Sequence, residues 1–348
     1  MMSGVESEPL TIGEHLGSHS TGCDDGDMTT TLTAVRERAA AIDQRSRGAV
    51  LGVGRIIVGL MWLANLHWKV PPDFGQDNGG GLFKYSASVS RHSPFAPFTW
   101  ITEQIIVPNF TFFGWVVLIA ETVVAGLLLI GYRTRLAALA GAGLAVPILL
   151  SVLYYDRADE WSWSYLLMIA AHLLIYASST GRSLDLDSAL GGGESRVRSA
   201  LRAVGIVTTV VGLLGLYVAR SVDFAGSRVA LLGSDAGFVN DAGELVRRWE
   251  LKFLWFNPLW ALVTIAAGLV VLAGHRVPVA ARMAGGVLMA AGAVVLVIGH
   301  FDYVRDDGTV QVISTASNTA VWWGLGLAVL LLDRRLRRLR TADHAAAA

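Results

Sequence analysis

The stretch FTFFGWVVLIAETVVAGLLLIGYR, which covers Phe110–Arg133, decides the fold class of this 348-residue chain. It is apolar almost throughout, and Glu121 is its one charged residue before the closing Arg. A helix needs about 20 apolar residues to cross a hydrocarbon core of about 30 Å. The stretch therefore predicts a membrane-spanning helix with a carboxylate near its middle.

Seven further apolar stretches lie before and after this one, so we predict an all-α polytopic membrane protein with eight transmembrane helices. The predicted spans are 49–68, 110–131, 136–154, 163–178, 203–219, 257–274, 281–300 and 319–333. The composition agrees, because 16% of the residues are charged, whereas a soluble domain has about 25%. The formal net charge is zero, which gives no indication of nucleic-acid binding.

The basic residues predict the orientation. Most of the 28 Lys and Arg fall in alternate connecting segments, including the run DRRLRRLR that follows the last span. Because Lys and Arg accumulate in cytoplasmic loops, this asymmetry predicts an N-in/C-in topology. In the long outer segment over 70–108, the apolar spacing from Phe98 onward predicts a short amphipathic helix at the membrane interface.

The chain also contains a candidate internal repeat. TVVAGLLLIGYR (Thr122–Arg133) is followed much later by TIAAGLVVLAGHR (Thr264–Arg276), which has one residue inserted. Parallel repeats are common in membrane proteins, so we predict two tandem four-helix bundles. The alternative is that Gly-, Leu- and Val-rich membrane sequence matches itself by chance. The predicted domains are a cytoplasmic tail over 1–47, a bundle over 48–190, a linker over 191–202, a second bundle over 203–333 and a basic cytoplasmic tail over 334–348. Within the first tail we predict disorder over 1–30 and a short surface helix over 31–47.

Ionisable residues at bilayer depth are the first candidates for function, because each costs about 2.5–3.5 kcal/mol to insert at the centre. Glu121, Arg55 and His172 lie inside the second, first and fourth spans. If these spans share one interior, the three side chains form a network in which Glu121 or His172 relays protons. The alternative is a buried ion pair that only fixes helix register. In the second half, Val263 stands at the position of Glu121.

The outer end of the first span offers a second candidate. Trp62, Asn65 and His67 could line the mouth of a quinone pocket, whereas His67, Trp68 and Lys69 together are typical of an interfacial anchor. We favour the anchor. We predict no metal site and find no soluble catalytic motif. Cys23 is the one cysteine, and there is no haem signature. Any electrons would therefore pass through a bound quinone or a partner's cofactor.

The first half resembles the DoxX family, in particular the DoxD-like small subunits of thiosulfate:quinone oxidoreductase. GRIIVGLMWL (Gly54–Leu63) and WKVPPDFG (Trp68–Gly75) carry the resemblance together with ETVVAGLLLIGYRTRLAAL (Glu121–Leu139) and GRSLDLDSAL (Gly181–Leu190). It covers about residues 48–190, and Arg55, Glu121, Gly131 and Arg133 occupy its signature positions.

The resemblance implies a four-helix bundle in a bacterial plasma membrane with a role in sulfur or thiol redox metabolism. We therefore predict an integral oxidoreductase subunit that binds quinone and receives electrons from a soluble or membrane-bound redox partner. Whether the chain is itself an enzyme, and whether it forms a homo-oligomer, is left open. One alternative is a non-catalytic scaffold or assembly protein, and a third is a small-molecule transporter.

Overall fold

The computed structural model describes residues 25–153, 162–178, 185–225, 228–239, 245–274, 278–304 and 310–347. The chain divides into two compact units, Met1–Arg45 and Ser46–Ala348. Helix α1 (Asp25–Leu66) begins in the first unit and ends in the second. All other described elements belong to the second unit.

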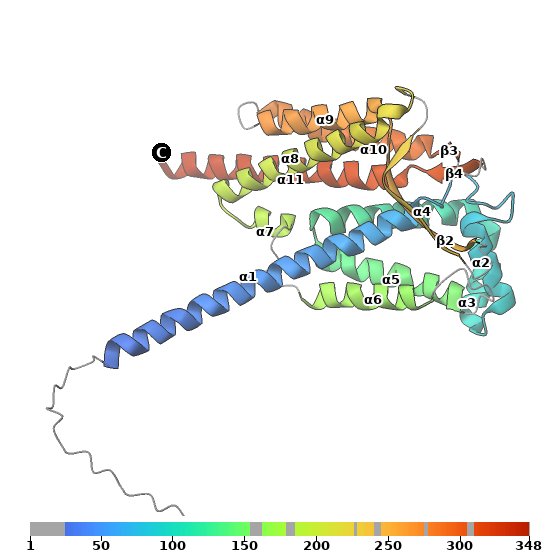
Figure 1. The fold of residues 1–348 in the computed structure, drawn as a ribbon, viewed down its shortest axis with the longest axis horizontal. Coiled ribbons are helices and arrows are strands. Elements are labelled where there is room, and N and C mark those ends of the chain that lie inside the picture. Colours follow the sequence, from blue (N-terminus) through green and yellow to red (C-terminus); the bar gives the residue numbers. More distant parts are fainter. Residues whose placement is uncertain are drawn as a thin grey trace, which may run out of the picture. The chain divides into compact units, whose positions relative to one another are not determined.

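The first half of the second unit is built from apolar helices and a cap of short helices (Figure 1). The long helices after α1 are α4 (Phe110–Ile130), α5 (Thr134–Leu153) and α6 (Ser162–Ala177). The cap consists of α2 (Gly81–His92), α3 (Ala96–Ile101), the π-helical η1 (Thr102–Ile106) and the 3₁₀ turn η2 (Val107–Asn109). The short α7 (Leu186–Leu190) lies at the other end of the long helices (Figure 1). Helix α5 packs between α4 and α6, and α2 also contacts α5.

The second half contains four longer helices and two hairpins. The helices are α8 (Glu194–Val218), α9 (Pro258–Ala273), α10 (Pro278–Ile298) and α11 (Ala316–Ala347), with a 3₁₀ turn η3 (Ala219–Ser221) after α8. Strands β1 (Val229–Val239) and β2 (Leu245–Phe256) pair antiparallel, as do β3 (His300–Val304) and β4 (Val310–Ser314). We predicted neither hairpin. β-Branched and aromatic residues favour strands, and they are frequent in β2 and β4, which end just before α9 and α11.

Six helical segments are long and apolar enough to cross a membrane: Ser46–Leu66, Ala96–Ile130, Thr134–Leu153, Glu194–Ser221, Val279–Ile298 and Ala316–Asp343. The apolar helices α6 and α9 are shorter, with 16 residues each. At 1.5 Å per residue each is about 24 Å long, less than the hydrocarbon core. The chain is thus a predominantly helical, multi-pass membrane protein, and the eight spans in tandem bundles stay a prediction.

Small residues bring the two halves together where α4 crosses α11. A Cβ atom on Gly126 would lie 2.9 Å from the Ala320 carbonyl oxygen, and one on Gly324 would lie 3.2 Å from that of Gly126. Such close backbone approach is how membrane helices gain van der Waals contact without a hydrophobic driving force.

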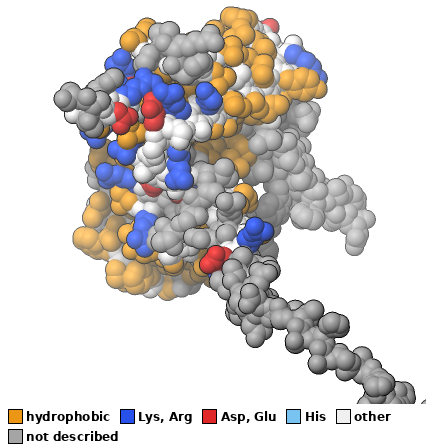
Figure 2. All heavy atoms as spheres, turned by 90° about the vertical axis from the view of Figure 1, so that its left-hand side faces the viewer, with side chains coloured by type: hydrophobic (Ala, Val, Ile, Leu, Met, Phe, Trp, Pro, Cys, Tyr) orange, Lys and Arg blue, Asp and Glu red, His pale blue; other side chains and the backbone are white. Residues whose placement is uncertain are grey.

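The basic residues predicted for the inner loops gather at one end of the second unit. Figure 2 shows this face, where α8 begins and α11 ends, with its Lys and Arg side chains interspersed with acidic ones. Arg340 lies 3.1 Å from Glu194, and Arg282 and Arg337 lie 3.6 Å and 3.0 Å from the buried carboxylate of Asp333. These ion pairs connect the ends of α8, α10 and α11. The side of the membrane that this face occupies stays a prediction.

The ends of several predicted domains differ from the structure. Residues 31–47 are helical, as predicted, because TLTAVRERAAAIDQRSR is rich in good helix formers, but the helix begins at Asp25 and continues into the first span. Residues 1–24 lie outside the described part. Helix α8 begins at Glu194, within the predicted linker. Helix α11 continues to Ala347, so the basic run belongs to the helix and not to a separate tail.

Candidate functional site

Glu121 is buried in the middle of α4 and pairs with Lys69. The Lys69 Nζ lies 2.8 Å from Glu121 Oε2, and both side chains are 1% exposed. Lys69 follows the end of α1, and its Nζ also donates to the Asn65 carbonyl oxygen at 2.8 Å. The ammonium lies 4.1 Å from the centre of the Trp68 ring, a cation–π contact. The charge of the intramembrane carboxylate is therefore compensated by a residue that follows the C-terminal end of α1.

The predicted ion pair between Arg55 and Glu121 is wrong. The Arg55 Nη1 donates instead to the carbonyl oxygens of Leu128 and, at 3.0 Å, Leu129. These carbonyls lie seven or more residues beyond Glu121 in α4, roughly 10 Å along the helix. Since α1 and α4 run antiparallel, Arg55 meets the end of α4 and Lys69 meets its middle. Membrane depth estimated from the sequence therefore assigned Arg55 to Glu121 in place of Lys69.

The Arg55 contact depends on Gly131, which ends α4 with a φ of +68°. Left-handed backbone favours glycine, and a Cβ atom here would lie 2.8 Å from Arg55 Cζ. Its carbonyl accepts from Asp187 N at 3.1 Å. Three of the predicted signature positions, Arg55, Gly131 and Arg133, thus meet at this end of α4.

His172 lies with Trp62 and not with the ion pair. The Trp62 Nε1 donates to His172 Nε2 at 2.9 Å, and His172 Nδ1 lies 2.7 Å from the Met168 carbonyl oxygen. Because the indole nitrogen can only donate, Nε2 accepts and Nδ1 carries the proton, which makes the imidazole neutral. Both ring nitrogens are engaged and both side chains are fully buried. The contacts of His172 thus give no support to its predicted part in a relay with Glu121.

Asn65 and His67 shape the turn that presents Lys69. The Asn65 Oδ1 accepts from Trp68 Nε1 at 3.2 Å, and His67 Nδ1 lies 2.6 Å from the Ala64 carbonyl oxygen. The interfacial anchor that we favoured at this position is only partly correct, because Lys69 is buried. Neither Asn65 nor His67 lines the cavity described next, and neither does Trp62.

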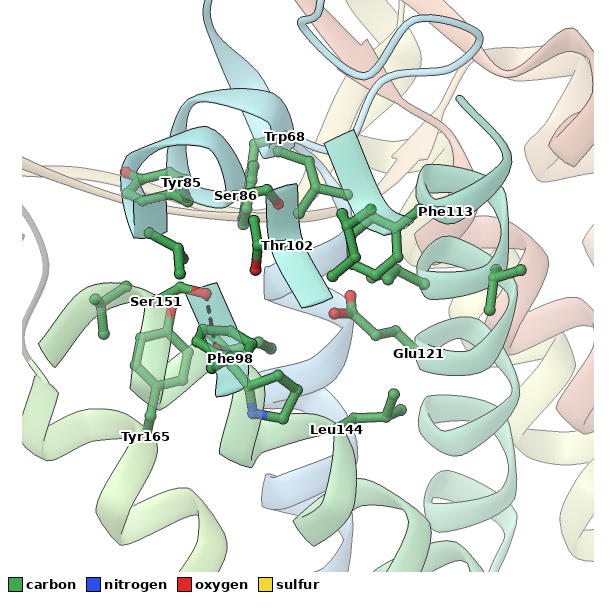
Figure 3. A pocket seen from close by; sticks show the side chains of 18 residues that line it. Trp68, Tyr85, Ser86, Phe98, Thr102, Phe113, Glu121, Leu144, Ser151 and Tyr165 are labelled. Atoms are coloured by element: carbon green, nitrogen blue, oxygen red, sulfur yellow. Dashed lines mark hydrogen bonds between the residues drawn. The ribbon is translucent and has the colours of Figure 1, made fainter. Parts of the chain in front are cut away.

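A cavity of about 220 Å³ lies beside Glu121, between α2, α3, η1, α4, α5 and α6 (Figure 3). Its wall is mostly aromatic and aliphatic. The lining residues include Trp68, Tyr85, Phe98, Ile106, Phe113, Val117, Leu144, Pro147, Ile148 and Tyr165. Drug-sized pockets have roughly 300–1,000 Å³, so this one suits a single ring and not a large ligand.

Two polar atoms in the cavity wall have no hydrogen-bond partner among the described residues. One is Glu121 Oε1, and the other is the hydroxyl of Thr102, whose side chain is 1% exposed. Figure 3 shows both side chains directed into the cavity, Glu121 from α4 and Thr102 from η1. By contrast, the Ser151 hydroxyl donates to the Pro147 carbonyl oxygen at 2.8 Å. Buried polar groups are nearly always bonded, so these two atoms indicate a ligand-binding site.

The local sequence explains this cap. Phe98, Thr102 and Ile106 follow one another at a spacing of four, so one face of the short helices lines the cavity. Phe74 is fully buried and packs edge-on against Trp115, with ring centres 5.7 Å apart. Gly114 leaves room for that ring, because a Cβ atom there would collide with it. The PPDFG segment thus holds the cap against α4.

Sequence reasoning missed Lys69 and Thr102 as site residues. Lys69 stands where interfacial lysines are common, and only its neighbours in space reveal its burial. Thr102 carried a weak signal, since it is the polar member of an otherwise apolar stripe that we predicted from Phe98 onward.

Comparison with known proteins agrees with the resemblance found in the sequence. Residues 53–192 match the family model described as TQO small subunit DoxD. No curated protein sequence and no solved structure matches the chain. The match contains Lys69, Thr102, Glu121 and the whole lining of the cavity. Residues 53–192 are therefore similar to a DoxD small subunit, and the helices from α8 onward lie outside the match.

Proposed function

We propose that this chain is the membrane subunit of a quinone-linked oxidoreductase and that the quinone ring binds in the cavity beside Glu121. The observation that carries the proposal is a buried carboxylate in the wall of a ring-sized, largely aromatic cavity. Val116, which also lines the cavity, is 48% exposed on the lipid-facing side of α4, which would let an apolar ligand tail leave toward the bilayer.

The residues suit proton transfer at a bound ring. A bound quinone would accept two electrons and two protons when it is reduced. Glu121 is placed to exchange protons with an occupant of the cavity, and Lys69 balances its charge at 2.8 Å when it is ionised. Trp68 and Phe113 offer flat apolar surfaces to a ring. His172 and Arg55 have no such place in this proposal, because their contacts lie elsewhere.

The electrons would come from a partner. The matching family is named as a small subunit, which implies a larger one, and the chain contains a single cysteine and no haem signature. We propose that a redox protein docks on the membrane subunit and that sulfur compounds such as thiosulfate are the donor. We also propose the plasma membrane of a bacterium as its location.

Replacing Glu121 by Gln tests the proposal. The variant keeps the shape of the side chain and removes its charge, so thiosulfate-dependent reduction of a short-chain quinone should fall about 100-fold in membranes that contain the partner. Glu103→Gln is the matched control, because Glu103 is exposed on η1 and does not line the cavity. Equal quinone reduction by wild type and Glu121→Gln, at equal protein abundance, would refute the role of Glu121.

A non-catalytic scaffold is the second candidate. One observation favours it: Lys69 already compensates Glu121 without any ligand, as a packing device would require. In that case Glu121→Gln lowers the abundance of the chain, and the activity per molecule of assembled complex does not change. Quantifying the chain in membranes beside the reduction assay separates the two candidates.

A further inference from the structure

The two unbonded polar atoms of the cavity define what its ligand must offer. Glu121 Oε1 and Thr102 Oγ1 are buried and lack partners among the described residues. A carboxylate can only accept hydrogen bonds, whereas a hydroxyl can donate or accept. The ligand must therefore bring at least one hydrogen-bond donor to Glu121.

The second carboxylate oxygen explains why Glu121 acts as an acceptor. The Lys69 Nζ lies 2.8 Å from Oε2, and Lys69 is 1% exposed. A buried ammonium stabilises the ionised form of the carboxylate that it contacts. With Oε2 occupied by Lys69, the remaining oxygen faces the cavity and has no donor.

The oxidised and reduced forms of a quinone differ in this property. The oxidised ring carries carbonyl oxygens, which only accept, and would leave Glu121 Oε1 without a donor. The reduced ring carries two hydroxyl groups, which donate. Leaving a buried charged acceptor unsatisfied is costly, and sites built around a ligand hydroxyl discriminate strongly against analogues that lack it.

We propose that the cavity binds the reduced, dihydroxy form of its ring ligand more tightly than the oxidised form. Glu121 Oε1 accepts a ligand hydroxyl, and Thr102 Oγ1 supplies a second polar contact from η1. This rests on the proposed function only in taking the ligand to be a quinone. Two electrons and two protons convert the quinone into the dihydroxy ring, so tighter binding of that product favours reduction in the cavity. Each tenfold preference raises the two-electron potential of the bound couple by about 30 mV.

The test compares three ligands on the purified full chain in lipid nanodiscs, under anaerobic conditions. They are a short-chain hydroquinone, the corresponding quinone and the dimethyl ether of the hydroquinone, which keeps the ring and loses both donors. Quenching of tryptophan fluorescence gives the Kd of each. We expect the hydroquinone to bind at least about tenfold more tightly than the other two, as one well-made bond to a charged acceptor allows.

The variants assign the preference to its residues. Glu121→Gln should reduce it to less than about threefold, because an amide both donates and accepts. Thr102→Val should weaken hydroquinone binding while Thr102→Ser retains it. Glu103→Gln should leave all three Kd values unchanged.

The comparison on the wild-type chain decides the proposal even if a variant fails to fold. If all three ligands bind with equal Kd, or if the quinone binds more tightly, the proposed preference is refuted and a quinone site in the cavity stands. If none of the three binds, the quinone site is refuted as well.

Discussion

At the scale of single residues, the main feature of the first half is the pairing of Glu121 with Lys69. A carboxylate inside α4 signals function from sequence alone, because the insertion cost is known. Its partner was predicted wrongly, since Arg55 lies inside the first span, whereas Lys69 follows α1 where interfacial lysines are common. The antiparallel arrangement of α1 and α4 selected Lys69, and Arg55 took backbone carbonyls instead.

Removing that cation should destabilise the protein strongly. We expect Lys69→Met to lower the free energy of unfolding by about 3–5 kcal/mol, because Glu121 is left buried and uncompensated. Lys84→Met is the matched control, since Lys84 on α2 is a half-buried lysine that is not paired with Glu121. Thermal unfolding in detergent measures both. The double variant Lys69→Met/Glu121→Gln should recover most of the loss, and simple additivity of the two single effects would contradict the pairing.

The Trp62–His172 bond gives a second prediction at this scale. Trp62→Phe leaves His172 Nε2 without a donor and should cost about 1–3 kcal/mol of stability. Ligand affinity should not change, because neither residue lines the cavity. Trp163→Phe is the control, as Trp163 is 62% exposed on α6. Thermal unfolding and fluorescence titration check the two parts. A lost quinone affinity with unchanged stability would restore Trp62 to the binding site.

At the scale of elements, short segments fasten the long helices. Asp187 in α7 accepts hydrogen bonds from Arg133 N at 3.0 Å and Thr134 N at 3.2 Å, the first free amides of α5. This carboxylate therefore caps α5 from a segment more than 50 residues away. Two pieces of the family resemblance, the Gly-Tyr-Arg turn and the Leu-Asp run, are thus halves of one contact.

Loss of this cap should loosen the start of α5. We expect Asp187→Ala to cost about 0.5–2 kcal/mol, the range measured for helix N-caps. Amide hydrogen exchange should rise over residues 133–137, and thermal unfolding gives the energy. Asp77→Ala, which removes an exposed carboxylate from the loop before α2, should leave both unchanged. Unaltered exchange in Asp187→Ala would show that α5 does not need this cap.

Among the elements, the apolar helices were predicted better from the sequence than the hairpins and the cap. Apolar length predicted α4, α5, α6, α9 and α10 within a few residues, since the bilayer sets that length, whereas α1, α8 and α11 extend well beyond their predicted spans. The hairpin β1–β2 escaped prediction although RWELKF, within β2, alternates polar and apolar residues, because its aromatics also fit an interfacial belt. The cap formed by α2, α3 and η1 was predicted only as an amphipathic stretch. Its fit over Glu121 depends on tertiary packing.

At the scale of the whole molecule, the two halves share one core and meet at the α4–α11 crossing. Gly126 makes this approach possible. Gly126→Ala places a methyl group 2.9 Å from the Ala320 carbonyl oxygen, so the helices must separate. We expect a loss of about 1–3 kcal/mol, as in overpacked cores.

Gly143→Ala is the control for this crossing, because a Cβ atom there meets nothing within 4 Å. Thermal unfolding of the two variants in the same detergent compares them. Equal midpoints would mean that α4 and α11 adapt without cost.

The turn that carries Lys69 is also bonded to the part of the chain outside the family match. The amide of Ser314, at the end of β4, donates to the His67 carbonyl oxygen at 2.8 Å. Gly299 lies against Pro71, where a Cβ atom would come within 2.8 Å of the proline ring. A chain shortened to residues 53–192 would therefore lose both contacts. Lys69, which balances the charge of Glu121, would then stand on an unsupported loop. The second half of the chain thus supports the turn that carries this charge, and selection for the Lys69–Glu121 pair alone would be enough to retain it.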